Sequence, residues 1–573
     1  MIALSCDNIS LSFGVEVILD KISFSINDGD KLGIVGVNGA GKSSLFKIIT
    51  GEYSSDGGDV FISKDKSVGV LDQYIGFESE NTLLSEMENS FPALLADEAR
   101  LSELHGQIEV NSASGKVDDE LIARYTSLSD KFTRDGGYEF RGRCKGILKN
   151  LGFDENFWYN RISSLSGGQK TRLALARLLL REPDILMLDE PTNHLDIDAL
   201  FWLENFLKNY RKTVLVVSHD RYFLDSVTNK ILDVENHHAK LYNGNYTRYM
   251  EQKRADREIQ ERHYKNQQAE ITRIEAYIEQ QRRWNRERNI IAAESRQKLL
   301  DKMERVERPK SLPDAIRLRF NKSGESGNDV LTVKHLCKAY PAKILFYDVN
   351  FLIKKNEHVF ITGQNGCGKS TLIKMLAEMS EPDNGSVEYG YNVTVGYYDQ
   401  ENQNLDDSKT VIDELWDTYP SLTQTEIRNA LALFLFRGDD ILKPVSILSG
   451  GERARLTLCK LILAKMNLLI LDEPTNHLDI NSREALEGAL EAFDGTIIAV
   501  SHDRYFINKL STRILDFNAV EDGRIFDYRG SYREYIDYKN ERLIKDNSAG
   551  ADNAASASKE QYLNAKKAQS DKR

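Results

Sequence analysis

One twelve-residue segment occurs twice in this chain. The first copy, ILMLDEPTNHLD, runs from Ile185 to Asp196, and the second, LLILDEPTNHLD, runs from Leu468 to Asp479. Around each copy the other motifs have the same spacing: a glutamine lies 31 residues after a loop lysine, and a histidine lies 30 residues after the carboxylate. Such a repeat means that one fold is present twice. The 573 residues of the chain, too many for one ordinary core, agree with this interpretation.

The two copies differ by one insertion. The interval from the glutamine to a later serine is 93 residues in the first copy and 49 in the second, which places 44 extra residues at about 93–137. Apolar residues recur there at helical spacing on both sides of a polar NSASGK segment. This pattern predicts a hairpin of two amphipathic helices, which is either packing decoration or a docking arm.

The segment between the copies is polar and contains neither glycine nor proline from Tyr246 until Pro309. It predicts two long helices, at about 249–281 and 290–306, with an apolar stripe at coiled-coil spacing. The stripe consists of Ile271, Ile274, Ile278, Leu299, Met303 and Val306. We expect four parts: an α/β domain at 1–240, a helical-hairpin linker at 241–322, a second α/β domain at 323–540, and a flexible or short helical tail at 541–573.

Composition excludes several classes of protein. A net charge of −12 argues against indiscriminate coating of nucleic acid. The five cysteines are scattered without CxxC spacing, so neither a disulfide framework nor a zinc site is expected. No apolar run approaches the roughly 20 residues that span a bilayer, and the N-terminus lacks the features of a secretory signal. We therefore expect a cytoplasmic protein that is not embedded in a membrane.

A glycine-rich loop follows an apolar strand and precedes an apolar-periodic helix in each copy, as GVNGAGKSS and GQNGCGKST. This context is typical of a phosphate-binding loop, whose backbone N–H groups surround phosphates while its lysine neutralises β and γ oxygens and its hydroxyl binds Mg²⁺. The candidate nucleotide-binding residues are Gly36, Asn38, Gly39, Gly41, Lys42, Ser43 and Ser44 in the first copy and Gly363, Asn365, Gly366, Gly368, Lys369, Ser370 and Thr371 in the second.

The apolar run of each copy, ILMLD or LLILD, ends in an aspartate, and a glutamate follows directly. The aspartate suits Mg²⁺, and the next glutamate should point elsewhere because strand side chains alternate, so it could activate a water. A histidine after the next apolar strand would sense the γ-phosphate. The candidate metal ligands are Ser43, Gln73, Asp189, Ser370, Gln400 and Asp472, and the candidate catalytic residues are Glu190, Glu473, His219 and His502.

A third motif, LSGGQ at Leu165–Gln169 and LSGGE at Leu448–Glu452, precedes an apolar-periodic helix in each copy. A serine and two glycines at a helix N-terminus form an anion nest that could hold a γ-phosphate. The candidate residues are Ser166, Gly167, Gly168, Gln169, Ser449, Gly450, Gly451 and Glu452.

Taken together, these motifs resemble the ATP-binding-cassette superfamily over almost all of residues 1–540. The resemblance implies an α/β fold of two P-loop NTPase cassettes joined by the helical linker, and Mg²⁺-dependent ATP hydrolysis. It implies that each ATP lies between one copy's phosphate loop and the other copy's LSGG segment, in a monomer whose cassettes pair within the chain. It also assigns adenine stacking to Phe13 and Tyr340, for which the alternative is a role as core aromatics.

Within the superfamily the chain resembles the ABC-F family, because it has tandem cassettes, two LDEPTNHLD segments, an insertion in the first cassette and a charged linker. Members are ribosome-associated translation factors, and some protect ribosomes from antibiotics. The resemblance implies that ATP-driven cassette closure places the linker in the tRNA exit site, near the P-site tRNA and the peptidyl-transferase centre. Antibiotic resistance, the ATPase subunit of a transporter and a DNA-associated ATPase stay open as alternatives.

The predicted linker tip is basic. Residues 281–298 carry six basic and two acidic side chains, and the tip of about eight residues resembles general translation factors more than long-tipped resistance proteins. Such a tip can neutralise rRNA phosphates and stack on bases, although a solvated hairpin is the alternative. The candidate RNA-binding residues are Arg282, Arg283, Trp284, Arg286, Arg288, Arg296 and Lys298.

Overall fold

The computed structural model describes residues 1–37, 39–71, 80–113, 118–193, 195–283, 287–303, 325–340, 343–398, 405–434, 436, 438–464, 466–476, 478–517, 525–539 and 541. Contacts between residues divide the chain into two compact units. Unit 1 comprises Met1–Tyr74, Arg181–Pro191 and Glu204–Ile316, and unit 2 comprises Ile75–Leu180, Thr192–Leu203 and Arg317–Arg573. The division runs through the first copy of the repeat, whose sheets belong to unit 1.

Unit 1 contains a six-stranded sheet in the order β5 (Val68–Leu71), β6 (Ile185–Asp189), β7 (Thr213–Val217), β3 (Lys31–Val35), β8 (Lys230–Glu235) and β9 (His238–Asn243). The first five strands are parallel, and β9 pairs antiparallel with β8. All five residues of β7 are buried, as expected for a parallel sheet that is covered on both faces. Helix α1 (Lys42–Thr50) follows β3, and α8 (Arg221–Val227) follows β7.

A second sheet of unit 1 is antiparallel, in the order β2 (Glu16–Asn27), β1 (Ile2–Phe13) and β4 (Gly57–Ile62). Its buried residues pack with α1 and the parallel sheet in one core, to which Leu4, Ile22, Ile34 and Leu45 contribute fully buried side chains. The core therefore holds α1, and with it the loop that precedes α1, between the two sheets.

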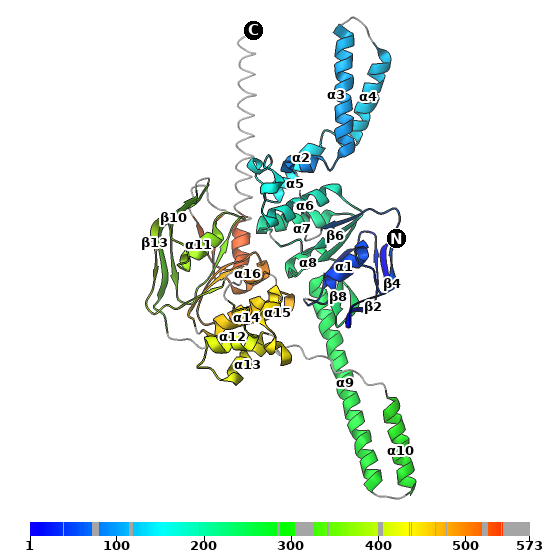
Figure 1. Ribbon diagram of the computed structural model, residues 1–573, viewed down its shortest axis with the longest axis vertical. Coiled ribbons are helices and arrows are strands. Elements are labelled where there is room, and N and C mark those ends of the chain that lie inside the picture. Colours follow the sequence, from blue (N-terminus) through cyan, green and yellow to red (C-terminus); the bar gives the residue numbers. More distant parts are fainter. Residues whose placement is uncertain are drawn as a thin grey trace, which may run out of the picture. The chain divides into compact units, whose positions relative to one another are not determined.

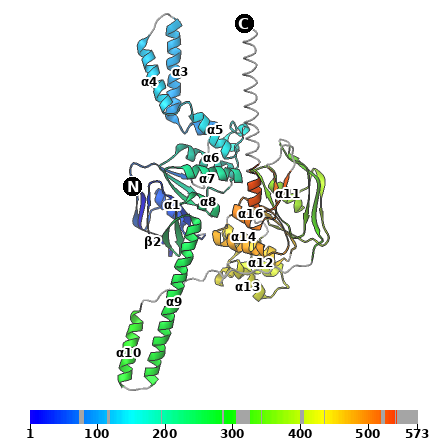
Figure 2. The ribbon, with the colours of Figure 1, turned by 180° about the vertical axis from the view of Figure 1, so that it is seen from behind.

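Two long helices end unit 1. Helix α9 (Tyr246–Arg283) has 38 residues, and α10 (Glu287–Lys302) lies beside it (Figures 1 and 2). Ile271, Ile274 and Ile278 pack against Leu300, which confirms the apolar stripe on α9. The prediction for Leu299 is wrong: its side chain is exposed, because the face of α10 that meets α9 carries Leu300 and Met303. Val306 lies outside the described residues.

Unit 2 contains the helical part of the first copy. Its helices are α2 (Leu83–Glu88), α3 (Pro92–Ala113), α4 (Asp119–Arg134), α5 (Phe140–Asn150) and α6 (Gly167–Arg181), with α7 (Ile197–Asn209) at the division. Helices α3 and α4 occupy the insertion and pack side by side (Figure 1), as the apolar spacing predicts. Lys131 of α4 forms an ion pair of 2.7 Å with Asp97 of α3 across this hairpin.

The second copy lies wholly in unit 2 and repeats the sheets of the first. Its parallel sheet has the order β14 (Val395–Tyr398), β15 (Leu468–Asp472), β16 (Thr496–Val500), β12 (His358–Thr362), β17 (Arg513–Asp516) and β18 (Phe526–Arg529). Its antiparallel sheet has the order β11 (Lys343–Lys354), β10 (Asp329–Tyr340) and β13 (Asn384–Tyr389). The helices are α11 (Lys369–Leu376), α12 (Val411–Thr418), α13 (Gln424–Leu433), α14 (Gly450–Leu463), α15 (Ile480–Glu491) and α16 (Arg504–Leu510).

The matching sheet orders confirm the expected α/β fold with two copies and a helical-hairpin linker. The register also repeats, since Asp189 pairs with Val217 and Asp472 pairs with Val500 at the carboxyl ends of equivalent strands. Within the described ranges, no helix combines the length and apolar character needed to span a bilayer.

Candidate active sites

The glycine-rich loops connect β3 to α1 and β12 to α11 through left-handed backbone. Gly41 has φ +91°, and a Cβ added to it would lie 2.7 Å from a methyl group of Leu19. The equivalent Gly368 has φ +109°. Glycine is needed here because a side chain would meet both the unfavourable φ and the packed strand β2. Residues beyond the loop then begin α1 with their N–H groups directed at the loop, which is the arrangement that binds phosphate.

The loop lysine is held by the loop itself in both copies. Lys42 Nζ donates to the carbonyl oxygens of Gly36 at 2.8 Å and Val37 at 3.0 Å. Lys369 Nζ donates to Gly363 at 2.7 Å and Gln364 at 2.9 Å. Both side chains are buried. Each ammonium group is therefore already placed inside the curve of its loop, where an anion would meet it.

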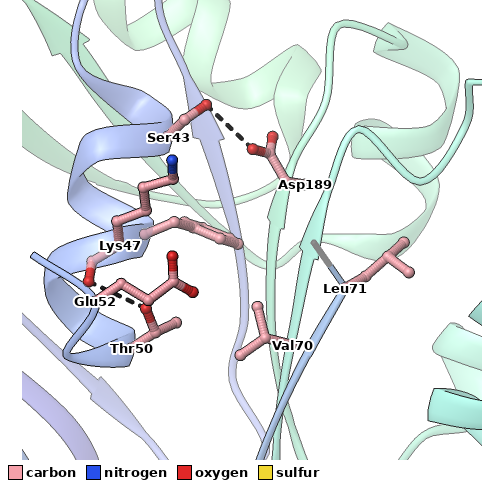
Figure 3. Close-up of a pocket in the computed structure, with 8 residues that line it drawn as sticks. Ser43, Lys47, Thr50, Glu52, Val70, Leu71 and Asp189 are labelled. Atoms are coloured by element: carbon pink, nitrogen blue, oxygen red, sulfur yellow. Dashed lines mark hydrogen bonds between the residues drawn. The ribbon is translucent and has the colours of Figure 1, made fainter. Parts of the chain in front are cut away.

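A serine hydroxyl and an aspartate carboxylate meet beside each loop. Ser43 Oγ donates to Asp189 Oδ2 at 3.1 Å, and Ser370 Oγ donates to Asp472 Oδ1 at 3.3 Å. Figure 3 shows Ser43 on α1 facing Asp189 at the end of β6, in a hollow that Lys47 and Glu52 also line. Two hard oxygen donors, one of them charged, fit the ligand preference of Mg²⁺. Both copies bring together the serine and the aspartate that are predicted to bind this ion.

The glutamate after each aspartate adopts a left-handed backbone conformation. Glu190 and Glu473 both have φ +48°, and their N–H groups donate to Val217 and Val500 at 2.9 Å. A non-glycine residue in this region is strained by about 1–3 kcal/mol and commonly lies at a functional site. Strand alternation was therefore the wrong reason for the direction of this side chain. The turn sets it, and nothing in the motif spacing indicated such a turn.

Each predicted histidine lies next to its glutamate. The distance from His219 Nε2 to Glu190 Oε1 is 3.5 Å, and the distance from His502 Nε2 to Glu473 Oε1 is also 3.5 Å. Burial raises the pKa of Glu473 to about 7, while the Lys369 ammonium acts in the opposite direction. Burial, and then Lys369, lowers the pKa of His502 to about 3. At neutral pH the second site therefore pairs a neutral histidine with a glutamate whose pKa lies well above its ordinary value.

The third motif forms a capped helix start in both copies. The Ser166 N–H donates to Gln169 Oε1 at 2.9 Å, and the Gln169 N–H donates to Ser166 Oγ at 3.3 Å. Ser449 and Glu452 make the same reciprocal bonds at 2.8 and 3.3 Å. This is a capping box, which fixes the first turns of α6 and α14. The last aspartate of the repeated segment also caps a helix, since Asp479 Oδ1 accepts from the Ser482 N–H at 2.8 Å, a role that the sequence analysis missed.

The two predicted adenine-stacking aromatics lie at the surface. Phe13 and Tyr340 are each 54% exposed, so neither is a core residue. The ring of Phe13 meets Tyr53 edge to face, with centroids 6.1 Å apart, and the Lys47 ammonium lies 5.0 Å above the Tyr53 ring. Adenine stacking stays a prediction for both residues.

Several predicted residues lie outside the described part of the chain. They are Asn38 of the first loop, the candidate metal ligands Gln73 and Gln400, the tip residues Trp284 and Arg286, and the side chain of Arg288. The pairing of each phosphate loop with the other copy's third motif also stays a prediction.

Comparisons with known proteins agree with this geometry. A family model described as ABC transporter matches residues 19–193 and 346–476, and a second model with the same description matches 232–320. ABC transporter F family member 5 of Arabidopsis thaliana is 35% identical over 93% of this chain and 77% of its own length. The chain belongs to the ABC-F family of ATP-binding-cassette proteins. As a member of this family it is an ATP hydrolase with two nucleotide-binding cassettes.

Other ABC-F relatives match over similar lengths. The protein YdiF of Bacillus subtilis is 44% identical over 95% of this chain and 84% of its own length. The energy-dependent translational throttle protein EttA of Mycobacterium tuberculosis is 34% identical over 92% of this chain and 94% of its own length. Among solved structures, an RNase-L inhibitor has a TM-score of 0.59 at 22% identity, covering 92% of this chain and 91% of that one, and the likeness concerns the fold.

Proposed function

We propose that this ABC-F ATPase binds the ribosome and regulates or rescues translation. ATP binding closes the cassettes, and the closed form places the linker in the tRNA exit site, near the P-site tRNA and the peptidyl-transferase centre. One relative that matches 92% of the chain is named a translational throttle protein. Nucleotide can drive this binding only if the closed form has a higher affinity for ribosomes than the open form.

The observation that carries the proposal is the basic far end of the linker. Arg282 and Arg283 end α9, and Arg296 and Lys298 lie on α10, all with exposed side chains. Arg283 pairs with Glu279 one turn earlier at 2.7 Å, and such an exposed pair contributes little energy. Because α9 extends for 38 residues, or about 57 Å, these cations lie far from the packed base of the helix. Exposed cations in such a position are suited to RNA phosphates.

The cassettes supply the energy through their own residues. Lys42 and Lys369 would exchange loop carbonyls for β- and γ-phosphate oxygens. Bound Mg²⁺, held by the serine and aspartate oxygens of each site, would neutralise phosphate charge. Glu190 and Glu473 would each take a proton from the attacking water, and the neighbouring histidine would hold the glutamate near the γ-phosphate.

The test is co-sedimentation of a Glu190→Gln, Glu473→Gln variant with purified ribosomes, with and without ATP. This variant should stay closed after it binds ATP. We therefore expect ATP to increase its association with ribosomes, and we expect the bound variant to block translation. Equal association with and without ATP would contradict the proposal. Mapping the ribosomal site of the linker by cryo-electron microscopy tests the predicted position in the tRNA exit site.

A charge variant separates the linker from general electrostatic attraction. Changing Arg282, Arg296 and Lys298 to glutamine should lower the slope of log affinity against log salt by about 2–3, one unit per lost phosphate contact. The matched control changes three exposed lysines of the second copy, Lys334, Lys354 and Lys374, to glutamine. Competition with branched DNA tests the DNA-associated alternative. If branched DNA displaces the chain from labelled ribosomes and an excess of free ribosomes does not, the result would favour that alternative.

A further inference from the structure

A buried polar cluster fastens the first turns of α9 to strand β8. We call Asp233, Tyr249 and Lys253 the α9 base cluster. Lys253 Nζ lies 2.5 Å from Asp233 Oδ2 and donates to the Tyr249 hydroxyl at 3.1 Å. Asp233 and Tyr249 are almost fully buried, so the aspartate depends on this cation for its charge compensation. The cluster therefore fixes where α9 leaves the cassette.

Contacts around the cluster extend this attachment to the β8–β9 hairpin. The rings of Tyr242 on β9 and Tyr249 on α9 meet edge to face, with centroids 5.1 Å apart. Lys240 on β9 forms an ion pair of 2.5 Å with Asp256 on α9, and Lys253 also lies 3.0 Å from Glu235. Ion pairs and an aromatic contact thus hold the first three turns of α9 against the β8–β9 hairpin.

The strand that carries Asp233 is in direct contact with the first phosphate loop. Val35, the last residue of β3, pairs with Asp233 in the parallel register of β3 and β8. A Cβ on Gly36, the first loop residue, would lie 2.4 Å from the carbonyl oxygen of Val234. Gly36 also accepts the hydrogen bond from Lys42. If Lys42 donated to a phosphate in place of Gly36, the Gly36 carbonyl would lose this donor, and the backbone beside Val234 would change its environment.

The second copy has the matching carboxylate without a linker. Asp516 on β17 occupies the position of Asp233 in the repeat, and the hydroxyl of Tyr535 donates to it. Tyr535 corresponds to Tyr249 and Lys539 corresponds to Lys253, but Lys539 Nζ forms its ion pair with Asp198 Oδ1, at 3.7 Å. Among the described residues the second copy therefore keeps the tyrosine–aspartate bond without the pair to this lysine, and no hairpin of long helices follows it. The lysine–aspartate pair occurs in the copy that carries the linker, and the second copy serves as its control.

We propose that the α9 base cluster couples the linker to the first phosphate loop, so that the seating of α9 on β8 depends on whether nucleotide occupies that loop. This inference rests on the proposed function, because it names the joint through which nucleotide would position the linker. Asp233 and Lys253 are positioning residues, which act through β8 and do not contact nucleotide.

The test is hydrogen exchange of residues 246–256 in the full chain without ribosomes, measured with and without a non-hydrolysable ATP analogue. In the parent we expect the analogue to change exchange by about fivefold or more, the size of an ordinary coupling between sites. Lys253→Met should abolish this nucleotide effect without abolishing nucleotide binding, because Lys253 does not contact the phosphate loop. Lys253→Arg should restore it. Asp516→Asn, the matched control, should leave the effect in place.

The outcomes separate coupling from mere support. Two results would overturn the proposal. In the first, Lys253→Met exchanges faster but still responds to the analogue as the parent does. In the second, the parent itself shows no response to the analogue. If Lys253→Met does not fold, Tyr249→Phe removes only a hydroxyl and is measured in the same way. This experiment contains no ribosomes. If the separate co-sedimentation test showed that the chain does not bind ribosomes, the proposed function would be refuted, but the result on coupling would still hold.

Discussion

The buried glutamate of the second site predicts a pH dependence of hydrolysis. Burial raises the pKa of Glu473 to about 7. A general base acts only when it is ionised, so the rate at this site should follow its ionised fraction. With a pKa of about 7, that fraction is about one tenth at pH 6 and about nine tenths at pH 8. The rate should therefore rise about tenfold between these pH values.

The assay uses a Glu190→Gln background, in which only the second site keeps its predicted base. Single-turnover ATP hydrolysis is measured from pH 5.5 to 8.5, and binding of a fluorescent ATP analogue is measured over the same range as the control. Burial lowers the pKa of His502 to about 3, so this histidine stays neutral throughout and adds no step to the profile. A rate that is equal at pH 6 and pH 8, with unchanged binding, would refute the assignment of Glu473 as a base with a raised pKa.

Three further predictions concern stability and reactivity. Glu473→Gln should stabilise the folded chain at pH 8 by about 3 kcal/mol. The pKa of Glu473 is raised from 4.5 in the unfolded chain to about 7 in the folded chain, so ionisation of this carboxyl group destabilises the folded state as the pH rises through that range. Thermal unfolding of the variant and the parent should therefore differ more at pH 8 than at pH 5. Gly41→Ala should cost about 1–3 kcal/mol and weaken nucleotide binding, because its Cβ would meet Leu19, whereas Gly142→Ala in α5, where a Cβ meets open space, should gain up to about 1 kcal/mol in the same denaturation assay. A maleimide should block the second site through the half-buried Cys367, and equal inactivation of Cys367→Ala would contradict this.

The fold followed from the repeat and from local patterns. The runs ILMLD and LLILD predicted buried strands, and both form interior strands of the parallel sheets, β6 and β15. The polar segment after Tyr246 predicted long helices, and α9 exceeds its predicted length because no glycine or proline interrupts it before Arg283. The predicted tip of about eight residues was too long for the same reason, since helix resumes at Glu287.

Tertiary contacts decided what the patterns could not. The left-handed turn at Glu190 and Glu473 depends on a backbone bond to the neighbouring strand, and a sequence motif does not encode that geometry. The α9 base cluster joins Asp233 to Lys253 across two elements, so helical or strand periodicity gives no sign of it. Which leucine of α10 faces α9 likewise depends on how the two helices are rotated against each other.

The length of α9 makes its base mechanically important. A rigid rod of 38 residues reaches about 57 Å, so each degree of tilt at its fixed end moves the free end by about 1 Å. A shift in side-chain packing too small to disturb the cassette core is thereby magnified into a displacement of several ångströms. At that scale, swinging the helix through five degrees would carry its arginines roughly the distance between neighbouring phosphates of a nucleic-acid strand.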